Sequence, residues 1–356
     1  MTERDKVVPT SYRRWNPLRD QYGLVSPHRL SRTWDGQTEE IEEPTVQDYE
    51  PNCYICPGNK RVGDKVNPQY TDTFVFGNDT PAFLATIVET SPKSLKTTSH
   101  NLFREEKETG VCEVISYSPK HNKTMANMSV LEIEKVVGLW RERFIEIGSR
   151  QDINHVLIFE TRGREMGSSN SHPHGQIWAQ EHVPNIPAVE NDKQRKYFDE
   201  TGRNMLLDYV GQEIAKDERV VYVNEDFVVL VPYWVEWPYE TMVLPRSRIS
   251  GIDELNNDQA ASLAKSLALV TRTYASLFER PKYGASYLMG IHQKPTDKKD
   301  HPELQMHIHF QVPYLTPSRF KFQAGYEKFG EKQRDMTAEQ AAQRLRECAQ
   351  ALGTTL

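Results

Sequence analysis

A short run of alternating polar side chains limits the folds open to this chain more than any other stretch of it. Residues 168–178 read Ser-Ser-Asn-Ser-His-Pro-His-Gly-Gln-Ile-Trp, with His172, His174 and Gln176 at every second position. Side chains alternate between the two faces of a strand, so this spacing predicts a strand that presents both histidines and the amide on one face. Pro173 cannot donate to a ladder, and we therefore expect an edge strand whose open side meets a ligand.

Two imidazoles and one neutral amide on a strand face suit the chemistry of an anionic phosphorus centre. One imidazole can attack phosphorus, the second can bind a metal, and the amide can donate to a phosphoryl oxygen. A neutral imidazole is a good nucleophile near neutral pH because its ordinary pKa is about 6.5. Gln176 cannot donate a proton as an acid, which favours transfer between phosphates over hydrolysis of poorer leaving groups. The alternative interpretation is a pair of surface histidines on a strand, which the strict alternation disfavours.

The same pattern recurs near the C-terminus, at His307, His309 and Gln311. In both halves it follows a strand, a loop, a capped helix and a further strand. The first half has strands at 111–117 and 155–160 and a helix capped by Ser129 and Glu132; the second has strands at 241–244 and 287–290 and a helix capped by Asn256 and Gln259. This order predicts an internal duplication within an α+β fold, in which residues 1–195 and 196–356 build one pseudo-symmetric antiparallel sheet with helices packed on it. The alternative is a chance recurrence of the His-x-His pattern.

Composition narrows the class of protein and its compartment. The chain has 356 residues, of which 37% are apolar, and this is enough for a substantial core. A formal net charge of -6 without a long Lys/Arg run argues against nucleic acid as the main partner. No apolar run approaches the ~20 residues of a membrane span. The first residues are charged and show no secretion signal, and four cysteines are too few for a disulfide framework, so we expect a reducing cytoplasm.

Two of the cysteines form a close pair, Cys53-Tyr-Ile-Cys56. This spacing is typical both of zinc ligands and of a redox pair. A redox pair is expected next to a βαβ pattern, and none surrounds these residues. The sequence therefore favours zinc, although it does not by itself identify the remaining ligands.

The central motif, Ser-Asn-x-His-Pro-His-Gly-Gln-Ile-Trp at residues 169–178, resembles the active-site signature of the galactose-1-phosphate uridylyltransferase family, a branch of the histidine-triad superfamily. The resemblance covers nearly the whole chain. Further matches follow in chain order at residues 13–18, 25–29, 78–79, 231–234, 237–238, 325–327 and 333–335. Landmarks this dispersed point to the one family, whereas the motif alone would indicate only the superfamily.

The resemblance implies an enzyme that moves UMP from UDP-glucose to galactose 1-phosphate, giving UDP-galactose and glucose 1-phosphate. It implies two displacements through a uridylyl-histidine, and a homodimer whose subunits share their active sites. A related ADP-glucose phosphorylase with the same nucleophile is the second hypothesis. A non-catalytic zinc-binding or nucleotide-binding module is the third, and the intact pair of histidines with the glutamine argues against it.

The resemblance also implies roles for individual residues. His174 is expected to be the nucleophile and Gln176 to hold the phosphoryl oxygens. The zinc ligands implied are Cys53, Cys56, His121 and His172, and those of a second metal, iron or zinc, are Glu190, His292, His307 and His309. The substrate-site residues implied are Arg29, Arg32, Val62, Asn78, Asp79, Thr161, Gly167, Ser168 and Ser169. The residues implied to reach into the partner subunit's site are Lys321, Phe322, Ala324, Tyr326, Glu327 and Gln333.

The chain departs from the family pattern at several positions. Thr161-Arg162-Gly163 stands where the family usually has Asn-Lys-Gly, and Ser168 and Ser171 stand where it usually has Cys and Pro. Ile291-His292-Gln293 replaces Trp-His-Gly, and Leu304 replaces a Trp before the second histidine pair. The first two departures lie beside the expected phosphate site, and the last two lie near the expected second metal site.

Overall fold

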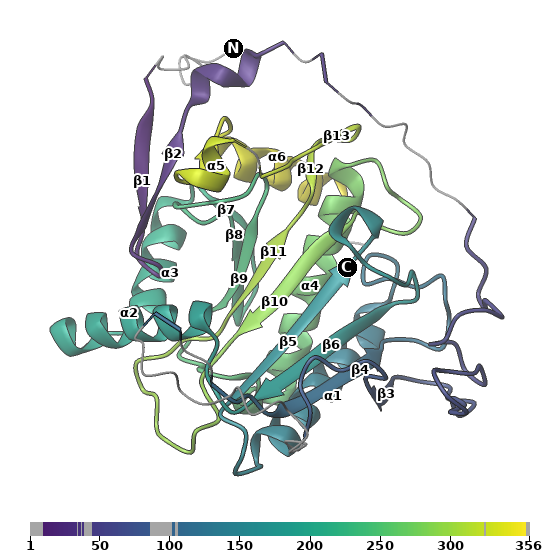
Figure 1. Ribbon diagram of the computed structural model, residues 1–356. Helices are drawn as coiled ribbons and strands as arrows, with labels where there is room; N and C mark the ends of the chain where they lie inside the picture. The colour runs from purple at the N-terminus through teal and green to yellow at the C-terminus, as the bar shows by residue number, and fades with distance from the viewer. Residues whose placement is uncertain are drawn as a thin grey trace.

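The computed structural model describes residues 10–33, 35–36, 38, 45–85, 102–103, 106–323 and 325–353. A nine-stranded antiparallel sheet fills the centre of the molecule (Figure 1), in the order β3-β4-β6-β5-β10-β11-β9-β8-β7. Its strands are β3 (Phe74–Gly77), β4 (Gly110–Ser116), β5 (His155–Arg162), β6 (His174–Gln180), β7 (Val220–Val223), β8 (Phe227–Leu230), β9 (Thr241–Pro245), β10 (Tyr287–His292) and β11 (His307–Gln311). Among the helices so described, none combines the length and the apolar character that crossing a bilayer requires.

The order of the strands carries the internal duplication. From one edge the first half contributes β3-β4-β6-β5, and the second half contributes β10-β11-β9-β8, which is the same order reversed. β5 pairs with β10 and joins the two halves in the middle of the sheet. The duplicated α+β fold predicted from the repeated motif is therefore confirmed, while the boundary at residue 195 stays a prediction.

One long helix in each half packs behind the sheet. α1 (Val130–Gly148) and α4 (Asn257–Leu277) contact each other, and each begins with the capping box predicted from the sequence. The capping side chains satisfy backbone N–H groups that the first turn of a helix leaves unpaired. The other helices are α2 (Asn185–Thr201), α3 (Met205–Lys216), α5 (Tyr326–Phe329) and α6 (Ala338–Ala351), with 3-10 turns η2 (Pro27–Ser31), η3 (Arg164–Met166) and η4 (Ile252–Glu254).

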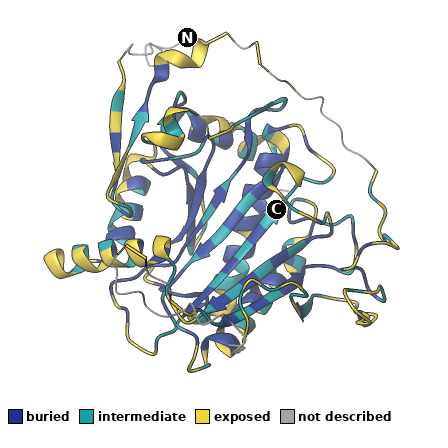
Figure 2. Ribbon diagram, in the orientation of Figure 1, coloured by how far each residue is buried: buried dark blue, intermediate teal, exposed yellow. Residues whose placement is uncertain are grey.

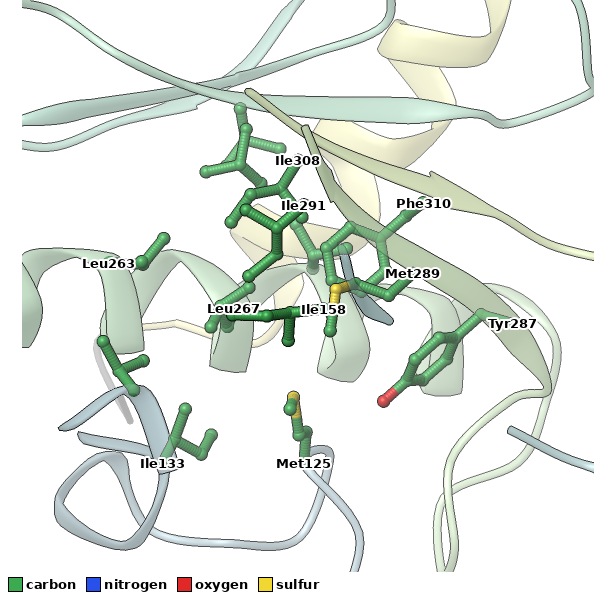
Figure 3. Close-up of a cluster of buried hydrophobic side chains, with 14 of the residues drawn as sticks. Met125, Ile133, Ile158, Leu263, Leu267, Tyr287, Met289, Ile291, Ile308 and Phe310 are labelled. Carbon is green, nitrogen blue, oxygen red and sulfur yellow. The ribbon is translucent and has the colours of Figure 1, made fainter. Parts of the chain in front are cut away.

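The main hydrophobic core lies between the sheet and the helices α1 and α4. Figure 3 shows side chains of β5, β10 and β11 gathered against α4, and Figure 2 shows buried and intermediate residues along these strands. The side chains labelled there include Ile158, Met289, Ile291, Ile308 and Phe310 from the strands and Leu263 and Leu267 from α4. Burying one such side chain contributes about 1.5–3 kcal/mol, so this face is closed to ligands.

On the opposite face, other parts of the chain pack against the two lateral ends of the sheet. The strand that carries the central motif lies between these two covered ends. At one end α3 and the N-terminal segment pack on β8 and β9, in a cluster that includes Leu18, Leu206 and Met242. At the other end the loop with the two close cysteines packs on β3 and β4 through Ile55 and Val114. We call the sheet surface between these clusters the open face.

Smaller sheets hold the chain termini. β1 (Tyr12–Asn16) and β2 (Gln21–Val25) form a hairpin, and β2 also pairs in parallel with β14 (Gln333–Arg334) on its other side. β12 (Tyr314–Thr316) pairs with β13 (Arg319–Phe320). The hairpin thereby ties the start of the chain to its C-terminal part.

The expectation that the central motif lies on an edge strand is wrong. β6 pairs with β4 on one side and β5 on the other. Pro173 is the residue before the strand, so its missing N–H leaves no gap in the ladder, and its carbonyl accepts from the Tyr117 N–H at 2.9 Å. The open face of the sheet, rather than an edge, is where these side chains can meet a ligand.

Candidate active site and metal centres

His174 begins β6, and a hydrogen bond fixes its ring. Its Nδ1 lies 2.7 Å from the carbonyl oxygen of His172. A carbonyl only accepts, so Nδ1 carries the proton and Nε2 keeps the lone pair. Burial of the ring lowers the pKa of His174 below its ordinary value, and this effect outweighs the hydrogen bond to the His172 carbonyl, which acts to raise the pKa. The result is a neutral imidazole with one defined nucleophilic nitrogen.

Gln176 lies two residues along the same face, and its amide is oriented by its neighbour. The Trp178 indole Nε1 donates to the Gln176 Oε1 at 2.9 Å. The carbonyl end of the amide is thus held, and its NH₂ group is the end left to donate. Gly175 between the two polar residues is required by packing, because a Cβ there would come within 2.1 Å of the Tyr117 hydroxyl. The alternation predicted for His174 and Gln176 is therefore present, with both ends of the arrangement fixed.

The first group of possible metal ligands joins three distant stretches of the chain. Cys53, Cys56, His121 and His172 bring one donor atom each within 4.8 Å of one another, and all four are buried. The Nδ1 atoms of His121 and His172 each lie 3.5 Å from the Cys56 sulfur. A hydrogen bond from Cys56 lowers the pKa of the Cys53 thiol well below its usual value, so the pair carries a negative charge.

The outer nitrogens of the same two histidines are held by the protein. His172 Nε2 lies 2.8 Å from the Ser118 carbonyl oxygen, and His121 Nε2 lies 2.9 Å from the Ser171 hydroxyl. Such partners fix the tautomer and turn the other nitrogen toward the cluster. Two sulfurs and two imidazole nitrogens in this arrangement fit a tetrahedral zinc ion. Ser171, one of the departures from the family pattern, is thus one of these partners.

The second group of possible ligands lies at the other end of the open face. Glu190 comes from α2, His292 from β10, and His307 and His309 from β11, and their donor atoms also lie within 4.8 Å of one another. Glu190 Oε2 is 2.5 Å from His292 Nδ1 and 3.3 Å from His307 Nε2. Burial would raise the pKa of Glu190, but its histidine neighbours hold that pKa well below the usual value. The carboxylate is therefore charged.

Two imidazoles of this second group, those of His307 and His309, are neutral near pH 7. Burial lowers the pKa of His307 to about 4 and that of His309 to about 3. His307 Nδ1 faces the Gln305 carbonyl oxygen at 3.2 Å, and His309 Nδ1 lies 3.4 Å from a Glu240 carboxylate oxygen. The buried Nε2 of His309 has no hydrogen-bond partner among the described residues. One carboxylate and three imidazoles fit a divalent transition metal, and the unpartnered His309 nitrogen is a buried donor available to such an ion.

The residues expected to bind the nucleotide fall into two separate groups. Asn78 and Asp79 follow β3 directly, in the same half of the sheet as β6. The Asn78 N–H donates to the Cys112 carbonyl oxygen at 2.9 Å, and Cys112 pairs with Trp178, so this pair lies level with Trp178 rather than with His174. Arg61 donates to Asp79 at 3.0 and 2.9 Å and lies over the Phe76 ring, and it is a residue that our sequence analysis missed. Its hydrogen bonds lower the pKa of Asp79 to about 2, so the carboxylate stays charged. Val62, next to Arg61, is exposed.

The loop before the motif places the next three candidates. Gly163 and Gly167 adopt positive φ angles of 86°, which reverse the chain after β5. The Ser168 N–H then donates to the Gly163 carbonyl oxygen at 3.0 Å, and the Ser168 hydroxyl donates to the Asn170 carbonyl oxygen at 2.8 Å. The side chain of Thr161 lies on the same face of β5 as that of Phe159, and Phe159 is paired with Gln176. These residues are brought to the His174 end of the open face.

The second group of residues expected to bind the nucleotide lies in another part of the molecule. Arg29 in η2 donates to Asp335 at 3.0 Å, and Gln333 donates to the same carboxylate oxygen at 2.6 Å. Lys321 and Arg334 bind Glu327, and Phe322 and Tyr326 are exposed. Figure 1 shows η2 and α5 at one end of the molecule and β3 at the other. Within one chain, Arg29, Arg32 and residues 321–333 are not brought to His174; Ala324 lies outside the described residues.

The other departures from the family pattern are explained by packing. Ile291 is fully buried in the core behind the sheet, although the next residue, His292, belongs to the second group of possible metal ligands. Leu304 is also buried. Gln293 accepts from the Ile252 N–H at 3.0 Å and so ties the end of β10 to the 3-10 turn before α4.

Two repeats with reversed strand order in one antiparallel sheet, each with a His-x-His pair, define a duplicated α+β fold. The chain belongs to the galactose-1-phosphate uridyl transferase family. Its residues 1–184 match the model of that family's N-terminal domain, and residues 190–353 match the model of the C-terminal domain. The resemblance inferred from the motif, and with it the assignment as a transferase enzyme, is confirmed.

Curated relatives carry the same family name over nearly the whole length. The galactose-1-phosphate uridylyltransferase of Haemophilus influenzae is 44% identical over 336 residues, which cover 94% of this chain and 93% of that protein. The Saccharomyces cerevisiae protein of the same name is 39% identical, with 94% of each chain covered. The Rattus norvegicus protein is also 39% identical, with 94% of this chain and 86% of that protein covered.

Solved structures agree on the fold. A uridylyltransferase structure superposes with a TM-score of 0.75 at 22% identity, covering 97% of this chain and all of that one. An ADP-glucose phosphorylase from Arabidopsis thaliana with bound ADP-glucose superposes with a TM-score of 0.72 at 21% identity, covering 95% and 99%. At these identities the likeness shows the fold alone, so it does not choose between the two sugar nucleotides.

Proposed function

We propose that the protein moves UMP from UDP-glucose to galactose 1-phosphate, giving UDP-galactose and glucose 1-phosphate, through a uridylyl group held on His174. Family membership and relatives at 37–44% identity support this reaction. The observation that supports the nucleophile is the His174 ring, whose Nδ1 is bound to the His172 carbonyl and whose Nε2 is left with its lone pair. Turnover with UDP-glucose and galactose 1-phosphate tests the overall reaction.

The chemistry divides into two displacements at phosphorus. In the first, the His174 Nε2 lone pair forms a bond to the α-phosphorus of UDP-glucose while the bond to the glucose 1-phosphate oxygen breaks. The leaving group departs as a phosphate and needs no proton. In the second, a phosphate oxygen of galactose 1-phosphate attacks the same phosphorus and the nitrogen–phosphorus bond breaks. The His172 carbonyl accepts a hydrogen bond from the His174 Nδ1–H in both steps, and the proton stays on the nitrogen. This hydrogen bond stabilises the positive charge that the ring carries while it is uridylylated.

An ADP-glucose phosphorylase remains the second hypothesis. Its only support here is the shared fold at 21% identity. The relatives of higher identity are named uridylyltransferases, so we favour UDP-glucose. The base pocket decides between the two, and the labelling experiment in the Discussion separates them.

We further propose that Cys53, Cys56, His121 and His172 hold a structural zinc ion, and that Glu190, His292, His307 and His309 hold iron or a second zinc. Zinc in the first site fixes His172, whose carbonyl in turn holds His174. It thereby supports the position of the nucleophile and takes no part in either displacement. A cytoplasmic location fits the four free thiols and the metabolic substrates, and it belongs to the same proposal.

We also propose a homodimer in which each active site uses residues of both subunits. Arg29 and Gln333 share a carboxylate partner, yet they lie away from His174 in the same chain. Phe322 and Tyr326 are 65% and 55% exposed, and such side chains suit a subunit interface. A site that needs these residues is completed by the second subunit.

Mixed dimers test this arrangement. His174→Ala and Gln333→Ala chains carrying different tags are co-expressed, and the mixed dimers are purified through both tags. Each variant alone is expected to be nearly inactive, while a mixed dimer keeps one intact site of two and about half of the parental activity. Dimers that combine His174→Ala with His174→Asn are the control and gain nothing. Mixed dimers that form and stay inactive would place Gln333 in its own subunit's site.

Gln176→Ala tests how the phosphoryl group is held. The Gln176 NH₂ group is expected to donate to a non-bridging oxygen, because its carbonyl end is already bound to Trp178. A hydrogen bond to a charged group contributes about 1.5–3 kcal/mol, so both half-reactions should slow by roughly 10–200-fold. Single-turnover rates of each half-reaction give the answer. Rates within twofold of the parent would leave Gln176 as an ordinary strand residue.

A further inference from the structure

The turn of the β1–β2 hairpin lies directly beside the second group of metal ligands. Figure 1 shows this end of the hairpin next to α2 and α3. Leu18, in the turn, is buried among side chains of α3, β8 and β9. The next residue, Arg19, donates from Nε to Glu190 Oε1 at 3.2 Å. A residue of the N-terminal segment therefore contacts a carboxylate of the second metal site.

The two oxygens of Glu190 have different partners. Oε1 accepts from Arg19, while Oε2 faces the imidazoles of His292 and His307. Arg19 is also balanced by a second carboxylate, since its Nη1 lies 3.6 Å from Glu236 Oε2. The guanidinium can thus hold one oxygen of Glu190 without drawing the other away from the histidines. Outer partners of this kind orient a ligand and typically change metal affinity 10–100-fold.

The same turn separates Glu190 from solvent on this side. An open hollow of about 560 Å³ lies over the turn and α2, lined by Arg19, Asp20 and Gln21 from the hairpin and by Ala188, Val189, Asp192 and Lys193 from α2. Glu190 itself is only 1% exposed. A second link, from Lys193 to Asp20 at 2.9 Å, joins α2 to the turn above it. Two ion pairs therefore link the hairpin turn to α2, and one of them ends on the buried Glu190.

The other end of the hairpin reaches the C-terminal segment. The N–H groups of Leu24 and Ser26 donate to the carbonyl oxygens of Lys332 and Arg334 at 2.8 and 2.7 Å. Arg13 binds Glu331. One rigid hairpin thus connects Glu190 to the segment that includes Gln333, with η2 and Arg29 following directly.

We propose that Arg19 is a positioning residue for the second metal centre, and that it couples a divalent cation bound there to the docking of the N-terminal hairpin. Coupling between two equilibria is reciprocal, so a contact that strengthens metal binding also strengthens docking when metal is bound. The metal at one end of the hairpin then stabilises the position of the segment at its other end. The inference depends on metal binding by Glu190 and its histidines and is independent of which nucleotide the enzyme uses.

Zinc affinity tests the first half of the proposal. Full-length protein is loaded with Zn²⁺, equilibrated against graded EDTA, and its zinc per chain is measured by mass spectrometry. The zinc that Glu190→Gln lacks identifies the second site. Arg19→Gln is expected to weaken zinc binding there by about 10–100-fold. Lys196→Gln is the matched control, because it removes a cation from α2 that is exposed and pairs with Glu200 rather than Glu190. It should change the affinity less than about threefold.

Amide hydrogen exchange tests the second half. In the parent, filling the second site should slow exchange of the Leu24 and Ser26 amides by about the same factor that Arg19→Gln takes from zinc affinity. In Arg19→Gln that protection by zinc should disappear. Parental zinc affinity in Arg19→Gln, an equal loss in Lys196→Gln, or amide exchange in the parent that does not change with zinc would each overturn the proposal. None of these readouts uses catalytic activity, so they stand apart from the test of uridylyl transfer.

Discussion

His174→Ala is expected to abolish turnover, with a loss of at least about 10⁴-fold, because removing a covalent nucleophile leaves only binding and electrostatic contributions. The parent should acquire an acid-labile label from UDP-glucose that carries radioactivity in its uridylyl phosphate. The variant should acquire none. The small side chain leaves the β6 ladder intact, so the folded state and the zinc content should stay at parental values.

Matched variants make this result specific to the nucleophile. His182 is an exposed histidine bound to Glu108, and His182→Ala should keep both label and turnover. Gln176→Ala should still acquire the label, only more slowly. The same experiment with labelled ADP-glucose separates the two sugar nucleotides, since only the true donor leaves its nucleotide on the protein. Label that persists in His174→Ala would show that another residue is attacked, and the mechanism above would be wrong.

Cys53→Ser is expected to remove the zinc ion of the first site and to destabilise the fold. Loss of a structural metal belongs to the small set of changes that cost about 4 kcal/mol or more. For a chain of 356 residues such a loss lowers Tm by roughly 5 °C. Zinc per chain, Tm and the rate of labelling are measured on the same samples. Because zinc fixes His172 and not the reacting atoms, surviving folded protein should still acquire label at a reduced rate.

Cys348 offers the control for this substitution. It is a free, half-buried thiol near the end of α6, away from every group of metal ligands among the described residues. Cys348→Ser should therefore leave zinc content unchanged and Tm within about 2 °C of the parent. Unchanged zinc in Cys53→Ser would show that the cysteine pair is not a metal site. A redox pair would then become the better interpretation of the spacing.

Local patterns were sufficient for the elements and for much of the candidate site. Capping pairs such as Ser129 with Glu132 are decided by three residues of spacing, and both helices begin where those pairs predict. The two His-x-His-x-Gln patterns identified the duplication, because a repeat records its own structure twice. The position of β6 was predicted wrongly, because Pro173 was treated as part of the strand when it is the residue before it. That error concerns one strand boundary, and it led us to predict an edge strand where the structure has an interior strand.

Two features of the site follow from neighbours that no short pattern contains. Arg61 and Asp79 are 18 residues apart in sequence and meet only because the cysteine loop folds over β3. Glu190 reaches the histidines of β10 and β11 across more than 100 positions of sequence. Our assignment of Glu190 came from the family resemblance, since a lone glutamate in a helix carries no local signal of metal binding.

The sequence by itself determined which chemistry is available: a neutral imidazole beside an amide, two close cysteines, and a second copy of the histidine pair. Those properties belong to single residues and to spacings of two or three positions, which the strand and helix periods convert directly into shared faces. Only the tertiary structure decided which nitrogen of each histidine is free, which carboxylate joins the second metal site, and that Arg19 lies against it. Those outcomes depend on strand order and register and on how the hairpin packs on α2, where groups far apart in the chain are brought within hydrogen-bonding distance.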